Sequence, residues 1–243
     1  MHELRDRNVS FRLGSAVNSI EHGATGGIRT KLADGRTVHS EMLLFAAGRV
    51  GATDRLNLDA AGITVDHRGR IQVDPVTLQT SVPHIYAAGD VIGFPSLAST
   101  SMEQGRVAAC HAFDMQPPPP PEFFPYGIYS VPEISTVGMT EEEVRKREIP
   151  YECGIARFRE TSRGQIMGLS SGMMKMIFST KTRRLLGVHI LGECATELIH
   201  IGQAVLNLKG TIDYFIQNNF TYPTLAEPYK IAGLDAWNRM MAR

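Results

Sequence analysis

The residues best suited to bind a ligand are gathered in residues 80–106, with Asp90 at their centre. The short apolar run 85–88 suits the interior of a sheet, although periodicity alone does not distinguish a strand from a buried helix here. Gly89 lets another group approach the backbone closely. Asp90 then places a carboxylate at the carboxyl end of the expected strand, where ligands bind in open α/β sheets. Because an ionised carboxylate only accepts hydrogen bonds, its expected partner is a hydroxyl or an N–H group.

A helix is expected to follow, because residues 99–101 are N-cap types and Thr100 and Glu103 have the spacing of a capping box. We expect this helix to continue to about Phe113. Its positive end, about +0.5 of a charge, would point at the same pocket. A ligand with a hydroxylated chain and a ring that becomes anionic, such as reduced flavin on its ribityl chain, fits this pattern. An ordinary turn followed by a plain helix cap fits it as well.

The second candidate site consists of Tyr222 and Glu227, in the segment FTYPTLAE at residues 220–227. A phenol with a pKa near 10 is a poor base at neutral pH, so we expect Tyr222 to act by shape, as a wall or lid. Glu227 is expected to hold the local turn. Two simpler interpretations stay open: Tyr222 packs under the last helix, and Glu227 is only the first-turn acid of that helix.

The composition is that of a globular protein, and it argues against several classes of partner. Of the 243 residues, 43% are hydrophobic and 21% are charged, which suits one large or two small domains. The formal net charge is zero, so nothing favours nucleic acid or an anionic membrane. No apolar run reaches the roughly 18 residues of a spanning helix, and the start MHELRD lacks the apolar core of a signal peptide. We therefore expect a cytoplasmic protein with no nucleic-acid or membrane partner.

The three cysteines argue against a metal site. Cys110, Cys153 and Cys194 lie far apart, and no Cys-x-x-Cys pair or Cys/His cluster is present. Reduced thiols that serve as small core residues are the expected state. No metal is predicted.

Residues 1–116 are predicted to form strands, hairpins and the one helix described above. The expected strands are 9–13, 17–20, 28–32, 36–39, 42–47, 63–65 and 71–73. Asp34-Gly35 is a strong two-residue hairpin signal. Residues 117–121 are a proline run, which forms neither helix nor sheet ladder, so we place a domain boundary and a linker there.

Residues 122–243 predict a domain of antiparallel strands and helices. Residues 140–143, TEEE, form a capping box that opens a short helix. The expected strands are 131–138, 151–158, 173–178 and 185–190, and the further expected helices are 196–208, 211–217 and 225–241. Residues 196–208 carry a broad apolar stripe that requires burial.

Taken together, these motifs resemble the pyridine nucleotide-disulfide oxidoreductase family. Thr80, followed after five residues by YAAGD (86–90), resembles its second FAD-binding motif. PSLA (95–98) with Glu103-x-Gly105 is similar to the segment that lies along the flavin ring in dihydrolipoamide dehydrogenases. The run ending at Gly48-Arg49 resembles the strand that passes close to the nicotinamide nucleotide.

The resemblance implies FAD as cofactor and NAD(P) as substrate. The residues that it places at the nucleotides are Gly48, Gly89, Asp90, Ser96, Leu97, Ala98 and Ser99. It also implies that residues 1–50 end an NAD(P)-binding domain, that residues 51–116 end an FAD-binding domain, and that residues 122–243 form a dimerisation domain of a homodimer. The expected fold class is therefore α/β and α+β: the ends of two Rossmann-like domains followed by an α+β dimerisation domain with an antiparallel sheet.

Tyr222 decides between branches of this family. Disulfide-reducing members have His-Pro-Thr-x-x-Glu here, and the His–Glu dyad of one subunit serves the flavin site of the other. With Tyr222 at the histidine position that proton relay is absent. Tyr-Pro-Thr followed by Ala-Glu is similar to the soluble FAD-containing transhydrogenases of the family, which implies hydride transfer between NADPH and NAD⁺ with Tyr222 and Glu227 as site residues. The alternatives are another flavin disulfide reductase-like enzyme, such as a mercuric reductase relative, or a non-catalytic dimerisation fragment.

Two features of such enzymes do not occur in the sequence. There is no G-x-G-x-x-G phosphate loop and no Cys-x4-Cys redox pair. In the family both belong to the amino-terminal half. The chain is therefore expected to be a carboxyl-terminal fragment that is inactive alone.

Overall fold

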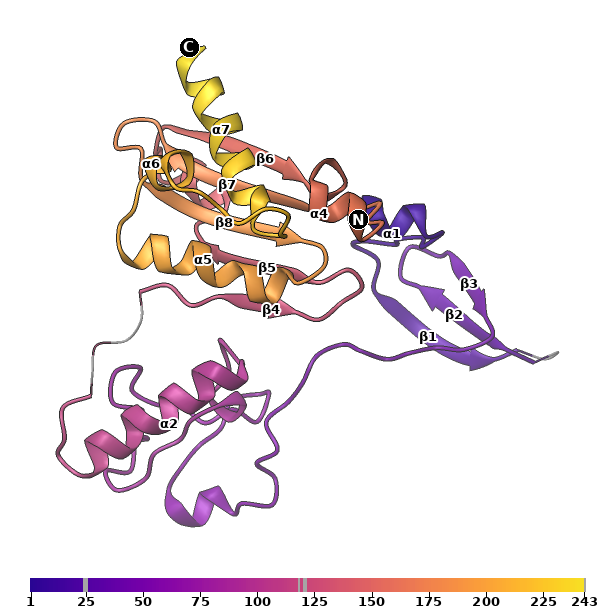
Figure 1. The fold of residues 1–243 in the computed structure, drawn as a ribbon. Coiled ribbons are helices and arrows are strands. Elements are labelled where there is room, and N and C mark those ends of the chain that lie inside the picture. The colour runs from indigo at the N-terminus through magenta and orange to yellow at the C-terminus, as the bar shows by residue number, and fades with distance from the viewer. Residues whose placement is uncertain (24–25, 118, 120–121, 243) are drawn as a thin grey trace. The chain divides into compact units, whose positions relative to one another are not determined.

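The computed structural model describes residues 1–23, 26–117, 119 and 122–242. The chain divides into two compact units, Met1–Pro119 and Pro120–Arg243 (Figure 1). Most of the predicted linker 117–121 lies outside the described residues. Each unit is described by itself.

The first unit begins with a short helix, α1 (His2–Asp6), followed by an antiparallel sheet in the order β1-β2-β3. Its strands are β1 (Val17–His22), β2 (Ile28–Leu32) and β3 (Thr37–Ser40). The Asp34-Gly35 hairpin is confirmed: Gly35 has φ +85°, and Asp34 accepts a hydrogen bond from the Arg36 N–H at 3.1 Å. The short side chains at the turn thus set the pairing of β2 with β3.

The rest of the first unit is mostly irregular. It contains the helix α2 (Ala98–Ala112) and short 3-10 turns at Leu58–Ala61 and Asp90–Ile92. A small buried cluster of Ile63, Ile71 and Ala87 holds it together. The hairpin expected around residues 63–73 is reduced to a single bridge between Val65 and Ile71.

Three strand predictions in this unit are wrong. Residues 9–13, 42–47 and 85–88 form no strand, and the last of these makes only one bridge, Gln79 to Tyr86. Backbone groups pair across a sheet, so an apolar run forms a strand only when a neighbouring strand is available. Among the described residues no strand lies beside 42–47, and Phe45 is 78% exposed.

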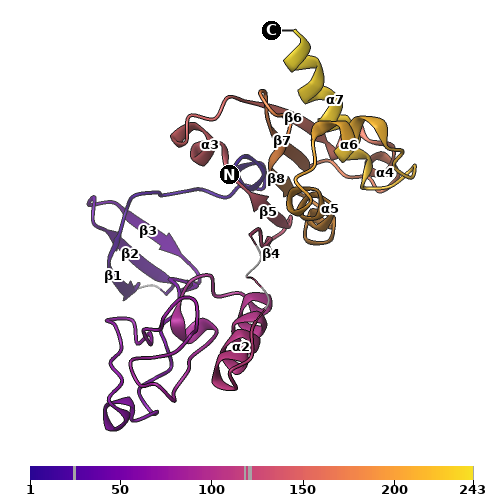
Figure 2. The ribbon, with the colours of Figure 1, turned by 90° about the vertical axis from the view of Figure 1, so that its left-hand side faces the viewer.

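The second unit is built on a five-stranded antiparallel sheet in the order β4-β5-β8-β7-β6 (Figures 1 and 2). Its strands are β4 (Tyr126–Ile128), β5 (Ile134–Gly138), β6 (Tyr151–Arg157), β7 (Met173–Ser179) and β8 (Leu185–Leu191). Its helices are α3 (Glu141–Lys146), α4 (Ser162–Ile166), α5 (Ala195–Asn207), α6 (Ile212–Gln217) and α7 (Glu227–Met241). The predicted antiparallel α+β domain is confirmed; α4 was not predicted.

The core of the second unit lies between the sheet and the helices α5 and α7. Met176 and Val188 pair across β7 and β8 and are fully buried, and a Cβ atom at Gly154 of β6 would lie 1.8 Å from the Ala232 carbonyl oxygen of α7. Glycine at residue 154 is therefore what lets α7 lie directly on the sheet. Glu133 caps α5 from outside, because its carboxylate accepts hydrogen bonds from the Thr196 N–H at 3.1 Å and the Thr196 hydroxyl at 2.8 Å.

The predicted capping box of α3 is also confirmed. The Thr140 side chain accepts from the Glu143 N–H, and the Glu143 carboxylate accepts from the Thr140 N–H at 2.7 Å. α3 begins where β5 ends, and it lies on the sheet face opposite the core. The polar side chains on that face are described below.

Candidate functional site

Asp90 lies at the start of the 3-10 turn Asp90–Ile92, directly after Gly89. Gly89 has φ +84°, and a Cβ atom there would lie 3.3 Å from the Ser101 hydroxyl oxygen of α2. The Gly89 N–H donates to Gln104 Oε1 at 2.8 Å. A residue without a side chain is needed at 89, because the backbone is left-handed there and lies against the first turns of α2.

The N-terminus of α2 differs from the predicted cap. Leu97 is the N-cap residue, and its side chain makes no capping hydrogen bond. Thr100 and Ser101 lie inside the helix, and their hydroxyls donate to the Leu97 carbonyl oxygen at 2.9 and 2.8 Å. Glu103 pairs with Arg106, so the predicted capping box does not form. No side chain of the described residues caps the first N–H groups of this 15-residue helix, which leaves its positive end available to a ligand.

The predicted residues 96–99 all lie at this helix end. Ser96 has φ +53°, and its hydroxyl donates to the Gly93 carbonyl oxygen at 2.6 Å. Leu97, Ala98 and Ser99 form the N-cap and the first turn. The structure therefore brings together the Gly89-Asp90 turn and the start of α2, through the Gly89 contacts given above.

Arg49 was not predicted as a site residue, yet its guanidinium forms an ion pair with the Asp90 carboxylate at 2.5 Å. Arg49 is 81% exposed and Asp90 is 39% exposed at the side chain. Gly48, just before it, has φ +97°, and a Cβ atom there would meet no other residue within 4 Å apart from its chain neighbours. The sequence could not give this contact, because the spacing of residues 49 and 90 carries no periodic signal. Because the long Arg49 side chain is exposed and the Asp90 carboxylate is only half-buried, the carboxylate remains accessible to another hydrogen-bond donor.

The residues of the first unit fit the flavin that the family motif implies. Asp90 offers acceptor oxygens for hydroxyl groups, and the uncapped end of α2 offers N–H groups and positive charge for an electron-rich ring.

Tyr222 lies at the surface of the second unit. Its side chain is 69% exposed, and its hydroxyl contacts the Ser162 hydroxyl at the start of α4. Ser162 was not predicted as a site residue. The capping side chain of α4, Thr161, accepts from the Gly164 N–H at 3.1 Å and is fixed by its own bond to the Phe158 carbonyl oxygen. The Ser162 hydroxyl, which contacts the Tyr222 hydroxyl, therefore lies on a short helix whose N-terminus is fixed by the Thr161 hydrogen bonds.

Glu227 is 8% exposed and lies at the first position of α7. Its Oε1 accepts from the Thr224 N–H at 2.9 Å, while the Thr224 hydroxyl donates to the Thr221 carbonyl oxygen at 2.7 Å. These bonds close the turn that carries Tyr222. The Tyr222 hydroxyl is directed to Ser162, so the two predicted site residues act on the same turn through different partners.

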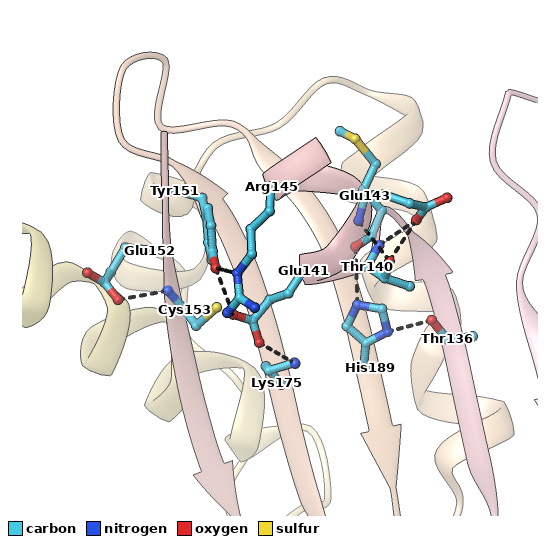
Figure 3. A network of polar contacts seen from close by, with 11 residues as sticks. Thr136, Thr140, Glu141, Glu143, Arg145, Tyr151, Glu152, Cys153, Lys175 and His189 are labelled. Carbon is cyan, nitrogen blue, oxygen red and sulfur yellow. Dashed lines mark hydrogen bonds and ion pairs between the residues drawn. The ribbon is translucent and has the colours of Figure 1, made fainter. Parts of the chain in front are cut away.

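A polar network on the open face of the sheet was missed by the sequence analysis (Figure 3). Glu141 of α3 accepts from Tyr151 at 2.9 Å, from Arg145 at 2.9 Å and from Lys175 at 2.8 Å. The Lys175 ammonium lowers the pKa of Glu141 to about 2. Lys175 and His189 lie opposite each other on β7 and β8, alternating with core residues. Alternation in these strands was the signal that could have placed them on one face.

Cys153 borders a shallow hollow of about 800 Å³ beside this network. Burial raises the pKa of the Cys153 thiol to about 11, so it is protonated at neutral pH and is a poor nucleophile. Across the described part of the chain, no group of three or more His, Cys, Asp or Glu side chains is arranged to hold a metal ion. Within the same residues, no helix has both the length and the apolar character to span a bilayer.

The fold is that of flavoprotein disulfide reductases. The chain superposes on the HOCl-induced flavoprotein disulfide reductase RclA from Escherichia coli with a TM-score of 0.87 and 27% identity, covering 96% of this chain and 53% of that one. It superposes on LpdA from Mycobacterium tuberculosis with a TM-score of 0.81 and 25% identity, covering 96% and 50%. The expected combination of Rossmann-like domain ends with an α+β dimerisation domain is thereby confirmed.

The chain belongs to the pyridine nucleotide-disulphide oxidoreductase family. Residues 1–105 match the family model "Pyridine nucleotide-disulphide oxidoreductase", and residues 124–232 match its "dimerisation domain". The chain is 53% identical, over 239 residues, to a protein from Mycobacterium tuberculosis named soluble pyridine nucleotide transhydrogenase, covering 98% of this chain and 51% of that protein. A protein of the same name from Klebsiella pneumoniae is 45% identical over 244 residues, covering 96% and 50%. The chain thus spans about half the length of the curated relatives it matches.

Proposed function

We propose that a longer parent protein containing this chain transfers hydride between NADPH and NAD⁺ with FAD as cofactor. The observation that carries the proposal is Tyr222: the residue at the place of the family's histidine base is an exposed phenol that contacts Ser162. Phenols ordinarily have a pKa near 10 and are poor proton acceptors at neutral pH. Relatives at 53% and 45% identity, both named soluble pyridine nucleotide transhydrogenase, support the same function.

The candidate site residues of this chain each have a defined part in that proposal. Asp90 accepts hydrogen bonds from the hydroxylated chain of FAD, and the first turn of α2, residues 96–99, directs positive charge at the flavin ring. Gly48 lets the nicotinamide nucleotide approach the backbone. FAD supplies the hydride-accepting and hydride-donating chemistry. Tyr222 and Glu227 shape the site of the partner subunit, Tyr222 as a wall and Glu227 by closing its turn. In this assignment residues 1–50 end the NAD(P)-binding domain and residues 51–116 the FAD-binding domain.

The proposal includes a homodimer formed through residues 122–243. The matching dimerisation family model supports it, and so do large apolar side chains that the second unit exposes. These are Ile128, Tyr129, Val131, Ile166 and Leu208. Light scattering on this chain at micromolar concentration tests it, with a dimer as the expected result and a clean monomer as the contrary one.

A reductase of disulfides is the second candidate, favoured by the superposition on RclA at a TM-score of 0.87. Such an enzyme needs a redox-active cysteine pair, which must then lie in the part of the parent that this chain does not include. The two functions differ in their substrates. Purified parent protein should reduce a thio-analogue of NAD⁺ with NADPH and should leave lipoamide and glutathione disulfide unreduced; the reverse pattern would favour the reductase.

The isolated chain is expected to be inactive and colourless. Asp90 and the start of α2 reach only the ribityl and ring parts of FAD, while a pyrophosphate is held by a glycine-rich loop and its helix, which this sequence lacks. Absorbance at the flavin wavelengths after purification measures retention, and a stoichiometrically yellow chain would contradict this expectation. A cytoplasmic location is part of the same proposal and follows from the soluble nucleotides that it uses.

A further inference from the structure

Tyr229 is the most enclosed polar side chain near the turn that carries Tyr222. It lies in the first turn of α7, two residues after Glu227, and is 0% exposed. Its hydroxyl accepts from the Gly202 N–H at 3.0 Å and donates to the Leu198 carbonyl oxygen at 2.7 Å. Burial raises the pKa of this phenol above its usual range, so it stays a neutral donor and acceptor.

Leu198 and Gly202 are four residues apart in α5, so their carbonyl and N–H groups are the two that an α-helix joins to each other. The Tyr229 hydroxyl thus bonds to both members of one helical pair. Glycine at 202 makes this approach possible: a Cβ atom there would lie 3.1 Å from the Tyr229 hydroxyl and 2.7 Å from Val188 Cγ2. A glycine inside a helix is destabilising relative to alanine, and this contact is its structural reason.

The Tyr229 ring continues the connection toward Tyr222. It is stacked nearly parallel on Phe215 of α6, with centroids 5.5 Å apart, and on Phe220, with centroids 6.3 Å apart. Phe220 lies two residues before Tyr222 in the chain. Tyr229 therefore bonds to α5 with its hydroxyl and contacts both α6 and the start of the turn with its ring.

A hollow lies beside the turn. It measures about 520 Å³ and is lined by Thr221, Thr224 and Leu225 of the turn together with Leu198 and Tyr214. Leu198 is the same residue whose carbonyl the Tyr229 hydroxyl binds. Besides the Tyr222–Ser162 contact and the Glu227–Thr224 bond given above, the turn is held at its two ends, by Phe220 and by the first turn of α7.

We propose that Tyr229 is a positioning residue for Tyr222: it fixes the 220–227 segment against α5 and so sets where the Tyr222 ring stands. This rests on the proposed function, in which Tyr222 is a wall of the partner subunit's flavin site. Tyr229 itself touches neither substrate nor cofactor in this proposal. Its effect on hydride transfer is exerted through Tyr222 alone.

The first test is hydrogen–deuterium exchange on this chain, which does not depend on activity. Tyr229→Phe should speed exchange in both 196–204 and 218–226 by about threefold to tenfold, the factor that one lost hydrogen bond gives. Tyr214→Phe is the matched control, because it removes a hydroxyl from a 44%-exposed ring in the same aromatic cluster; it should change neither segment. Faster exchange in 196–204 alone would overturn the proposal.

The second test uses the parent protein and separates positioning from stability. At a temperature where the variant is folded, Tyr229→Phe should lower kcat about tenfold with KM for both nucleotides within twofold, less than the hundredfold that a 1 Å displacement can cost. In a Tyr222→Ala background the same change should lower kcat no further. Reductions that multiply would show that Tyr229 acts independently of Tyr222 and would overturn the proposal.

If Tyr229→Phe does not fold, Gly202→Ala provides the same test, because its Cβ atom would displace the Tyr229 hydroxyl from α5. It should give the kcat loss in the wild-type background and none in the Tyr222→Ala background. If the wild-type parent transfers no hydride at all, the proposed function fails, while the exchange experiment still decides whether Tyr229 couples α5 to the turn.

Discussion

The two units of the chain treat similar apolar sequences in opposite ways. Residues 173–179 and 42–47 are both short apolar runs, yet the first forms β7, an inner strand of a five-stranded sheet, and the second forms no strand. Phe178 is 0% exposed, whereas Phe45 is 78% exposed. The difference lies in the neighbours: β7 is paired on both sides, and no described strand lies beside 42–47.

This comparison shows that a buried strand is a property of its sheet. The backbone groups of 42–47 would need a neighbouring strand that the described residues do not offer, whereas 85–88 finds only turn and loop partners such as the Leu78 carbonyl oxygen, which accepts from the Ala87 N–H at 3.1 Å. The curated relatives are about twice as long as this chain. The second unit, by contrast, carries every strand of its sheet within its own sequence, so its pattern could be interpreted directly.

The largest expected effect tests this contrast with two phenylalanines. Phe178→Ala should destabilise the second unit by about 3–5 kcal/mol, because it opens a cavity beside Phe215 in a closed core. Phe45→Ala should change stability by less than about 0.5 kcal/mol, since its ring is already in water. Urea unfolding measures both: fluorescence of Trp237, the one tryptophan of the chain, reports the second unit, and far-ultraviolet circular dichroism reports the first unit as well. Equal losses from the two substitutions would mean that residues 42–47 are packed in solution.

The next effect concerns charge in the first unit. In the parent protein, Asp90→Ala should weaken FAD binding by about 1.5–3 kcal/mol, the contribution of a hydrogen bond to a charged group. Asp59→Ala, an exposed carboxylate on the 3-10 turn Leu58–Ala61, is the matched control and should leave FAD affinity unchanged. Flavin fluorescence during dilution measures the dissociation constant. Unchanged affinity in Asp90→Ala would remove Asp90 from the site.

A pH effect between pH 7 and pH 5 is expected from a histidine in the second unit. His189 Nδ1 lies 2.5 Å from the Thr136 hydroxyl, and its Nε2 lies 3.2 Å from the Met139 carbonyl oxygen, so the neutral ring joins the end of β5 to the start of α3 (Figure 3). Burial lowers the pKa of His189, with Lys175 acting in the same direction, while the hydrogen bond with the Met139 carbonyl oxygen, Glu142 and Glu141 act against it. The unfolded chain therefore binds this proton more readily than the folded one.

The sign of the effect follows from that difference. The stabilisation is complete above the unfolded pKa of about 6.5 and is lost as the pH falls through that value toward the folded pKa. His189→Gln should thus show a smaller loss of unfolding free energy between pH 7 and pH 5 than the wild type. His200→Gln, at an exposed position of α5, should follow the wild-type curve. The same slope in all three proteins would exclude His189 as the titrating group.

The second unit shows how far local signals carry. The capping box at Thr140–Glu143 and the hairpin strands β7 and β8 were predictable because caps and alternation are set by residues close in sequence. The short helix α4 was not, since its cap Thr161 depends on the Phe158 carbonyl and on Gly164, where a Cβ atom would lie 1.8 Å from that same oxygen.

The candidate site shows the same division. Asp90, Tyr222 and Glu227 could be singled out from motifs, but their partners Arg49 and Ser162 lie 41 and 60 residues away, and no spacing rule links such positions. The predicted cap of α2 failed because Thr100 and Ser101 bond back to the Leu97 carbonyl inside the helix, an alternative that hydroxyl side chains always have. Contacts made through folding, rather than through local sequence, were the part that could not be predicted.

The smallest expected effect separates charge in the first unit from shape in the second. If Tyr222 acts as a wall, Tyr222→Phe keeps the ring and loses only the hydroxyl contact with Ser162. Hydride transfer from NADPH to an NAD⁺ analogue by the parent should then fall by less than about tenfold, a barrier change below about 1.4 kcal/mol. Ser162→Ala removes the same contact from the other side and should give the same small loss, and the double variant should lose no more than either single one.

Tyr222→His should not create lipoamide or glutathione reduction, because a base alone supplies neither redox cysteines nor a disulfide pocket. Steady-state rates of both reactions on the four proteins decide between the roles: a thousandfold loss in Tyr222→Phe would make the hydroxyl a participant in the chemistry, and the site of the second unit would then depend on a proton rather than on a surface.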